Sequence, residues 1–361
     1  MTSDANMTER LTAWLRTQLP DADKVHVEGF DRVNFGHSAE MMMLTVVTRS
    51  GDQDARQDVV LRLRPKPPAL LEPYDLARQF TILRALENTP VRVPRALWLE
   101  DTGEVLGRPF FVMERAAGDV YEMEAPAGVA DQTVARMCES LAEQLAAIHS
   151  VDLAQTGLDA LDDGGDHLER ELEHWAAEMN RVKRDRLPAL ERLRQELRDR
   201  KPEPCPNITL VHGDAKPGNF AFTDGEVSAV FDWEMTTVGD PLTDIGWLEM
   251  LWVQPVGINS HPAALTIDAM LTHYESVSGI KVQNRSWYRA FNAYKMAVIC
   301  LIGAMLIEDG HSDDRKLVLA AYGTSLMTKA GLAELGIDEP FDDGPVLPRD
   351  ERIQQVLAHS T

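Results

Sequence analysis

The segment from Leu210 to Trp247 constrains this chain most, because it specifies a strand, a loop, a hairpin and a helix start in fixed order. A short apolar run leads into a loop rich in glycine and proline, which ends at Asn219. Two β-prone runs then flank Asp224-Gly225, a pair that favours a two-residue hairpin turn. Because the hairpin returns the chain to its starting point, Asp232 is predicted to lie beside Asn219.

The polar residues of this segment have the spacing H-x-D-x-x-x-x-N, followed by an isolated aspartate. In phosphoryl transfer one carboxylate orients the attacking hydroxyl, while an amide and a second carboxylate hold Mg²⁺. Asp214, Asn219 and Asp232 supply these groups in that order. Lys216 either offsets phosphate charge or points to solvent, and His212 is interpreted as a brace for the loop. The segment therefore predicts a phosphotransferase site.

These residues resemble the aminoglycoside phosphotransferase family, which shares a bilobal, protein-kinase-like fold with choline kinases. The run DWE-x-x-x-x-GDP-x-x-DIGW is similar to the branch associated with acyl-CoA dehydrogenases. The resemblance covers roughly residues 25 to 310. Supporting segments are VVLRLRP (Val59–Pro65), PFFVMERAAGD (Pro109–Asp119), LAAIH (Leu145–His149), HLERELEHW (His167–Trp175) and YESVSG (Tyr274–Gly279).

The resemblance implies an α+β fold with a small antiparallel-sheet N-lobe and a large, mainly helical C-lobe. The expected lobes are residues 1–115 and 116–361, with the catalytic loop at 210–247 in the second. Patterning agrees with this division. It predicts helices at 8–19, 71–86, 131–149 and 166–200 (broken near Pro188), strands at 25–30, 41–48, 59–63 and within 105–113, and a polar hairpin loop at 50–57.

The nucleotide-binding half of the site departs from the protein-kinase pattern. Gly36 could offer its backbone and Ser38 its hydroxyl to phosphates, although an ordinary β-turn is the alternative. In VVLRLR, Arg62 occupies the place of the phosphate-pairing lysine of kinases, and Arg64, on the same strand face, is the second choice. The helix that carries a glutamate in kinases has Gln79, so we expect this amide to orient the arginine.

The resemblance also places an adenine-reading connection after the strand at Phe110–Met113. There the Glu114 carbonyl and the Ala116 amide would bind the base. Because both contacts use the main chain, they do not distinguish ATP from GTP. The alternative interpretation is that Glu114 is a solvated residue at a strand end.

Charge and composition indicate which partners to expect. With 36 basic and 58 acidic residues the net charge is −22, which disfavours nucleic acid or an anionic membrane. The three cysteines lie far apart, which supports neither a disulfide framework nor a zinc site. The N-terminus has no apolar signal core, and the apolar run Met296–Ile307 is interpreted as a buried helix. We therefore expect a cytoplasmic location.

The function that the resemblance implies is Mg²⁺-dependent transfer of the γ-phosphoryl group of ATP or GTP to a hydroxyl of a small molecule. An unspecified hydroxylated metabolite is ranked first as acceptor, followed by an acyl-type metabolite held by apolar C-terminal helices. Last comes an aminoglycoside held by an acidic rim at 159–173, a stretch that also fits a solvated helix face. The alternative from another class is a catalytically silent nucleotide-binding scaffold.

Overall fold

The computed structural model describes residues 4–33, 40–338, 343 and 350–358. Contacts divide the chain into two compact units. The first, here the sheet unit, consists of residues 1–119 together with 220–234. The second, here the helical unit, consists of residues 120–219 and 235–361. The hairpin that follows Asn219 therefore groups with the sheet unit, although it lies far along the chain.

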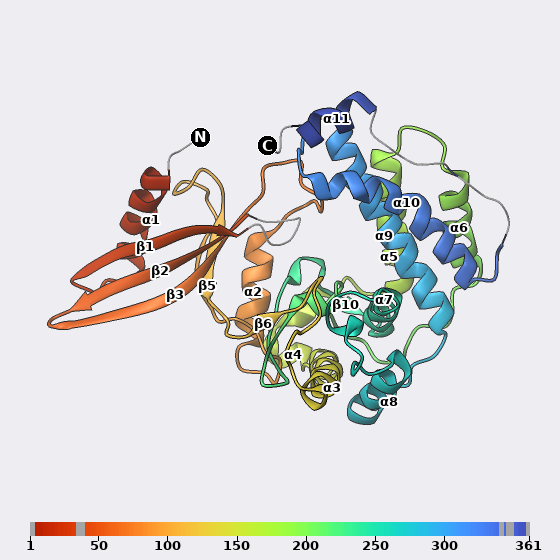
Figure 1. Ribbon diagram of the computed structural model, residues 1–361, viewed down its shortest axis with the longest axis horizontal. Coiled ribbons are helices and arrows are strands. Elements are labelled where there is room, and N and C mark those ends of the chain that lie inside the picture. Colours follow the sequence, from red (N-terminus) through yellow and green to blue (C-terminus); the bar gives the residue numbers. More distant parts are fainter. Residues whose placement is uncertain (1–3, 34–39, 339–342, 344–349, 359–361) are drawn as a thin grey trace. The chain divides into compact units, whose positions relative to one another are not determined.

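The sheet unit is built on a five-stranded antiparallel sheet with strand order β1-β2-β3-β5-β4. Its elements are α1 (Asp4–Gln18), β1 (Lys24–Val33), β2 (Glu40–Ser50), β3 (Gln53–Leu63), α2 (Leu76–Leu86), β4 (Ala96–Glu100), β5 (Phe110–Glu114), β8 (Phe220–Thr223) and β9 (Glu226–Val230), with β6 (Asp119–Val120) at the boundary (Figure 1).

Successive side chains of β3 point to opposite faces of the sheet, so that the core residues and Arg62 lie on different faces. Leu61 and Leu63 belong to the hydrophobic core that α1 shares with the sheet. Trp14 of α1 packs edge-on against Phe110, with ring centroids 4.9 Å apart. Because neighbouring residues of a strand point to opposite faces, Arg62 leaves this core and lies on the other face of the sheet. The strand thus buries an arginine on the face of the sheet opposite that core.

The predicted hairpin is present between β8 and β9. Phe220 pairs with Val230, and both turn residues have positive φ, 52° at Asp224 and 86° at Gly225. A turn of this kind matches the right-handed twist of the strands that it joins. The hydroxyl of Ser228 donates to the Ala117 carbonyl at 2.5 Å, which ties the hairpin to the sheet unit.

In the helical unit the long helix α9 packs against α5, α6, α7, α10 and α11, whereas α3 packs against α8 (Figure 1). Helix α9 is long and apolar enough to cross a membrane, but 83% of its most apolar window is buried inside the structure, as in a core helix of a globular domain. The elements are α3 (Asp131–His149), α4 (Leu153–Thr156), α5 (His167–Val182), α6 (Pro188–Asp199), β7 (Thr209–Val211), β10 (Thr237–Gly239), α7 (Leu242–Trp252), α8 (Ile267–Ser278), α9 (Arg285–Glu308), α10 (Arg315–Glu334) and α11 (Asp350–Ala358).

Most predicted elements are confirmed, and the exceptions have physical reasons. The helix predicted at 71–86 begins only at Leu76, because the Asp75 side chain caps it by accepting the Arg78 N–H. The loop predicted at 50–57 is wrong, since Ser50 pairs with Gln53 and the strands run almost to the turn. These strand residues are exposed and therefore polar, and a polar run of this kind is also typical of a loop. Strand β4 is an additional element, and the apolar run that follows Pro94 is its signal.

Candidate functional site

The Asp214 carboxylate is held at both of its oxygens within the helical unit. The indole Nε1 of Trp247 donates to Oδ1 at 2.9 Å, and the amide Nδ2 of Asn219 donates to Oδ2 at 2.8 Å. The backbone N–H of Asp214 donates to Nδ1 of His212 at 3.2 Å. The Lys216 ammonium lies 3.8 Å from Asp214 Oδ2 and 3.5 Å from the Glu122 carboxylate. The loop therefore presents an oriented carboxylate beside a cation.

Hydrogen bonds orient the Asn219 amide, and its side chain is almost fully buried. Its Nδ2 also donates to the backbone carbonyl of Asp214 at 2.8 Å. With both N–H bonds directed at Asp214, the carbonyl Oδ1 faces the other way, and among the described residues it has no hydrogen-bond partner. This leaves a carbonyl oxygen available at the end of the loop, at 3₁₀ helix η2 (Pro217–Asn219).

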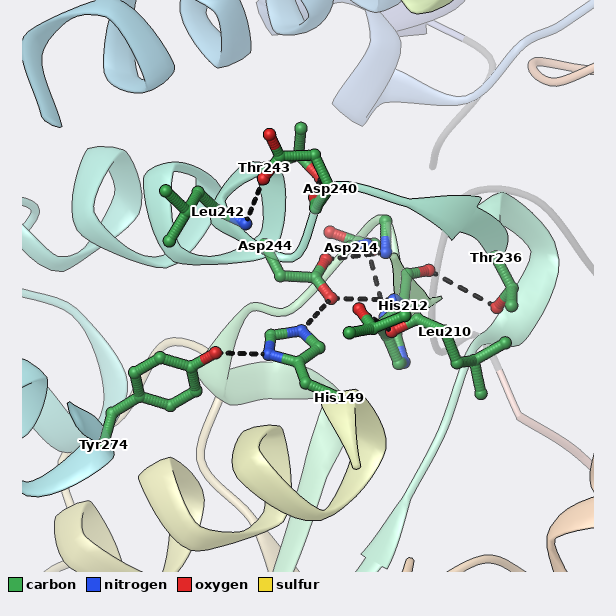
Figure 2. Close-up of polar contacts among 12 residues, drawn as sticks. His149, Leu210, His212, Asp214, Thr236, Asp240, Leu242, Thr243, Asp244 and Tyr274 are labelled. Carbon is green, nitrogen blue, oxygen red and sulfur yellow. Dashed lines mark hydrogen bonds and ion pairs between the residues drawn. The ribbon is translucent and has the colours of Figure 1, made fainter. Parts of the chain in front are cut away.

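A buried carboxylate, that of Asp244, fixes the start of the loop (Figure 2). It accepts the backbone N–H groups of His212 at 2.7 Å and Gly213 at 2.8 Å. Nε2 of His149 lies 3.1 Å from Asp244 Oδ2, and Nδ1 of the same ring lies 2.6 Å from the Tyr274 hydroxyl. The structure thus gives Asp244 and His149 a bracing role.

Electrostatics keep Asp244 ionised in this setting. Burial by itself would raise the pKa of the Asp244 carboxyl. The hydrogen bond from His149 and the bond from the His212 backbone outweigh burial, so the pKa of Asp244 is lowered from its ordinary value. A charged acceptor makes stronger hydrogen bonds to backbone N–H groups than a neutral one does.

In the sheet unit a second polar cluster surrounds Arg62. Nη2 of its guanidinium donates to Oδ1 of Asp232 at 2.6 Å, to Glu234 at 3.1 Å and to the Tyr74 hydroxyl at 2.8 Å. Only 7% of the Arg62 side chain is exposed, against 20% for Asp232 and 8% for Glu234. The cluster is therefore a buried cation shared by two carboxylates, with the more accessible carboxylate being Asp232.

Burial alone would lower the pKa of the Arg62 guanidinium, but Asp232, Tyr74 and Glu234 raise it above its ordinary value. The expectation that Gln79 orients this arginine is wrong. Gln79 is buried on α2, but the described hydrogen-bond partners of Arg62 are Tyr74, Asp232 and Glu234. Tyr74, Asp232 and Glu234, which lie outside α2, therefore hold Arg62 in place of a glutamate on that helix.

Asp232 itself has φ 65°, a left-handed conformation that aspartate and asparagine adopt more readily than other side chains with a Cβ. It follows the end of β9 by two residues, as the sequence predicted. The left-handed backbone conformation thus changes the direction in which the Asp232 side chain leaves the chain after the hairpin.

The other sequence candidates differ in what the structure says of them. Gly36 and Ser38 lie outside the described residues. Arg64 is half-exposed and lies 3.6 Å from Glu72. Glu114 ends β5, and its N–H donates to the Arg95 carbonyl at 2.9 Å.

Each unit contains an oxygen group of the kind that Mg²⁺ binds together with phosphate oxygens. Mg²⁺ prefers hard oxygen ligands and in nucleotide sites takes one or two from the protein. The Asn219 carbonyl oxygen and the Asp232 carboxylate are ligands of this kind. Among the described residues no group of three or more His, Cys, Asp or Glu side chains gathers as a metal site. The three cysteines are free thiols.

Four residues that contact these clusters have no catalytic or binding role predicted from the sequence. Glu234 and Tyr74 contact Arg62, Trp247 contacts Asp214, and Lys295 of α9 contacts the loop backbone at Gly213. Glu234 could have been found, because it stands two residues from Asp232. Tyr74, Trp247 and Lys295 lie 12, 33 and 82 positions from the residues that they contact, and no spacing pattern in the sequence predicted these contacts.

Comparison with known proteins supports one family. The family model described as "Phosphotransferase enzyme family" matches residues 46–280. The acyl-CoA dehydrogenase family member 10 of Mus musculus is 31% identical over 258 residues, which is 68% of this chain and 24% of that protein. The chain thus spans about a quarter of the length of this relative, and its name agrees with the branch that the sequence resembles.

Solved structures confirm the kinase-like α+β fold. A provisionally assigned aminoglycoside phosphotransferase of Ralstonia eutropha superposes with a TM-score of 0.74 at 23% identity, covering 91% of this chain and 98% of that one. An aminoglycoside phosphotransferase solved in a ternary complex with ADP and hygromycin B has a TM-score of 0.58 at 15% identity, covering 90% and 98%. At these identities the likeness concerns the fold.

Proposed function

Because the chain belongs to the phosphotransferase enzyme family, we propose that it transfers the γ-phosphoryl group of ATP or GTP to a hydroxyl of a small metabolite. The observation that supports this most is the Asp214 carboxylate, oriented at both oxygens by Trp247 and Asn219. A carboxylate in this state accepts a hydrogen bond from an alcohol and takes its proton late in the reaction. The rate then comes from positioning and electrostatics.

Mg²⁺ would be held by Asn219 and Asp232, and when bound it neutralises charge on the phosphate oxygens. Asn219 keeps its carbonyl oxygen directed away from Asp214, and the Asp232 carboxylate accepts a hydrogen bond from the guanidinium of Arg62. Lys216 supplies a further positive charge, 3.8 Å from the Asp214 carboxylate. Each of these roles fits the charge and hydrogen bonds of the side chain concerned.

Arg62 has two tasks in this proposal. Its Nε and Nη2 atoms hold Tyr74, Asp232 and Glu234, whereas Nη1 makes no hydrogen bond to a described residue. We assign Nη1 to the nucleotide phosphates, for which a planar guanidinium is well suited. Gly36, Ser38, the Glu114 carbonyl and the Ala116 N–H complete the proposed nucleotide contacts.

The acidic stretch at 159–173 gives little support to a polycationic acceptor, because several of its carboxylates already have partners. Asp166 caps α5 and pairs with Lys201, and Glu169 lies 2.8 Å from Arg198. The proposed acyl pocket of the C-terminal helices has little support as well, since Trp287, Phe291 and their neighbours on α9 are buried in packing. An unspecified hydroxylated metabolite remains the preferred acceptor.

The acceptor classes differ in their response to salt. A polycation held by exposed carboxylates would bind more weakly as ionic strength rises, because charges are screened over about 10 Å at 0.1 M. We expect the KM of the acceptor to change less than twofold between 0.05 and 0.5 M salt, roughly the response of a weakly charged ligand. A steep rise in KM, repeated when Asp162, Asp163 and Asp166 are neutralised together, would restore aminoglycoside modification as the function.

The decisive experiment measures Mg²⁺-dependent release of ADP or GDP across a library of hydroxyl compounds, with Asp232→Asn as the control. The variant should fold, since asparagine accepts positive φ and Arg62 retains Glu234. It should also lose nearly all turnover, because a neutral amide oxygen is a weaker ligand for Mg²⁺ than a charged carboxylate. Turnover that Asp232→Asn leaves intact would refute its role, and nucleotide binding without any transfer would favour the silent scaffold.

A further inference from the structure

A buried lysine of helix α9 contacts the loop that carries the Asp214 carboxylate. Lys295 of α9 is almost fully buried, and its ammonium donates to the backbone carbonyl of Gly213 at 2.7 Å. Gly213 is the residue immediately before Asp214. The lysine therefore holds the loop at the peptide group that joins Gly213 to Asp214.

The same ammonium lies over an aromatic ring that touches Asp214 directly. Lys295 Nζ is 4.8 Å from the centroid of the Trp247 ring, a cation–π distance, and 5.6 Å from that of Trp175. The indole N–H of Trp247 donates to Asp214 Oδ1 at 2.9 Å. Trp247 is itself 2% exposed. The indole is thus confined between the ammonium and the carboxylate.

A buried lysine is costly, because its charge loses hydration. Burial lowers the pKa of the Lys295 ammonium, with Glu171, Asp244 and Asp214 opposing this effect. An apolar side chain of similar length, such as methionine, would fill the space without that cost. Fold stability alone gives no reason for an ammonium here, whereas its contacts with Gly213 and Trp247 both lead to Asp214.

We infer that Trp247 and Lys295 are positioning residues for phosphoryl transfer: the indole N–H orients the Asp214 carboxylate, and the ammonium fixes the indole and the Gly213 peptide. This rests on the proposed function of Asp214. The Asp214 oxygen that faces Asn219 then keeps its own orientation, because the carboxylate cannot rotate without breaking the indole hydrogen bond.

The kinetic test compares Trp247→Phe with Trp252→Phe. Trp252 lies on the same helix, is buried, and donates its indole N–H to the Leu265 carbonyl at 3.2 Å, away from Asp214. Loss of one hydrogen bond to a charged group should lower kcat about 10- to 100-fold in Trp247→Phe. The nucleotide KM, and the stoichiometry of nucleotide binding measured by calorimetry, should stay within about twofold of the parent. If the variant were merely partly unfolded, the stoichiometry would fall together with kcat. Trp252→Phe should keep kcat.

Lys295→Met tests whether the two residues act together. If the ammonium works through the indole, the double variant Trp247→Phe/Lys295→Met should be no slower than the worse single variant. If the fold-losses in kcat of the two single variants multiply in the double variant, the two residues act independently and the coupling is refuted. Where Trp247→Phe fails to fold, the analogue β-(3-benzothienyl)alanine at position 247 keeps both fused rings and removes only the N–H donor.

A spectroscopic test is independent of turnover. The seven tryptophans give indole N–H resonances in a ¹⁵N-edited NMR spectrum of the full chain. We expect the Trp247 resonance to shift in Asp214→Asn and in Lys295→Met by far more than the other six. An unmoved resonance overturns this inference even if the enzyme is active. Absence of phosphoryl transfer with a shifted resonance overturns the proposed function and leaves the contact standing.

Discussion

Replacing Asp244 with asparagine tests how much of the loop geometry depends on one buried charge. The carboxylate is fully buried and accepts three hydrogen bonds, from the backbone N–H groups of His212 and Gly213 and from the ring of His149. Asparagine retains one acceptor oxygen and turns an N–H₂ group toward a donor. At least one buried N–H group then loses its partner.

The magnitude follows from these contacts. Removing one partner from a buried, charge-assisted network costs about 3–5 kcal/mol. Since whole domains are stable by only about 5–15 kcal/mol, this is a large fraction of the free energy of unfolding. Urea unfolding followed by far-UV circular dichroism of the full chain should register it as a lower midpoint of the main helical transition.

Asp268→Asn provides the matched control. Its side chain is 75% exposed and pairs with Arg285 at 2.8 Å, so the same chemical change should cost below about 1 kcal/mol. An Asp244→Asn variant that unfolds within 1 kcal/mol of this control, roughly the worth of a surface ion pair, would refute the argument that the buried carboxylate holds the loop.

The effect has a definite pH dependence. The pKa of Asp244 in the folded protein is below its ordinary value of 3.8. A carboxyl with a lowered folded pKa contributes stability that is fully present above the unfolded pKa and is lost as pH falls through the folded pKa. The difference in stability between the parent and Asp244→Asn should therefore be constant at neutral pH and shrink in acid. A difference that grows in acid would contradict the assignment.

Two further variants test the remaining parts of the site. Arg62→Lys keeps the charge but loses the planar group that spans three partners, so nucleotide KM should rise and kcat fall in steady-state assays, while Arg64→Lys should change neither. Comparable effects at both positions would move the phosphate role away from Arg62. Gly213→Ala should abolish soluble expression or lower Tm strongly, because φ is 85° and a Cβ would collide with the Met235 carbonyl, whereas Gly128→Ala, with φ 74° and open space, should fold at a modest cost. Equal Tm values for the two glycine variants would contradict the steric argument.

Local patterns in the amino-acid sequence determined several elements of this protein by themselves. Asp224-Gly225 between two β-prone runs predicted the β8–β9 hairpin, because Asp and Gly both tolerate the positive φ that a tight hairpin turn of this type requires. The helical periodicity at 131–149 predicted α3 with its bounds, and Pro188 separated α5 from α6. Each of these signals acts over a few residues, so the sequence carries it in full.

Tertiary structure decided the partners of the predicted site residues. Arg62 could be placed on its strand, but its partners Asp232 and Glu234 lie 170 and 172 positions away. Trp247 is 33 positions from Asp214, and Lys295 is 82 positions from Gly213. Backbone conformation is set by neighbours along the chain, whereas a buried charge takes whichever partner the packing of distant elements brings within about 3 Å. For that reason the sequence named Asp214 and Asp232, and only the fold determined which side chains hold them.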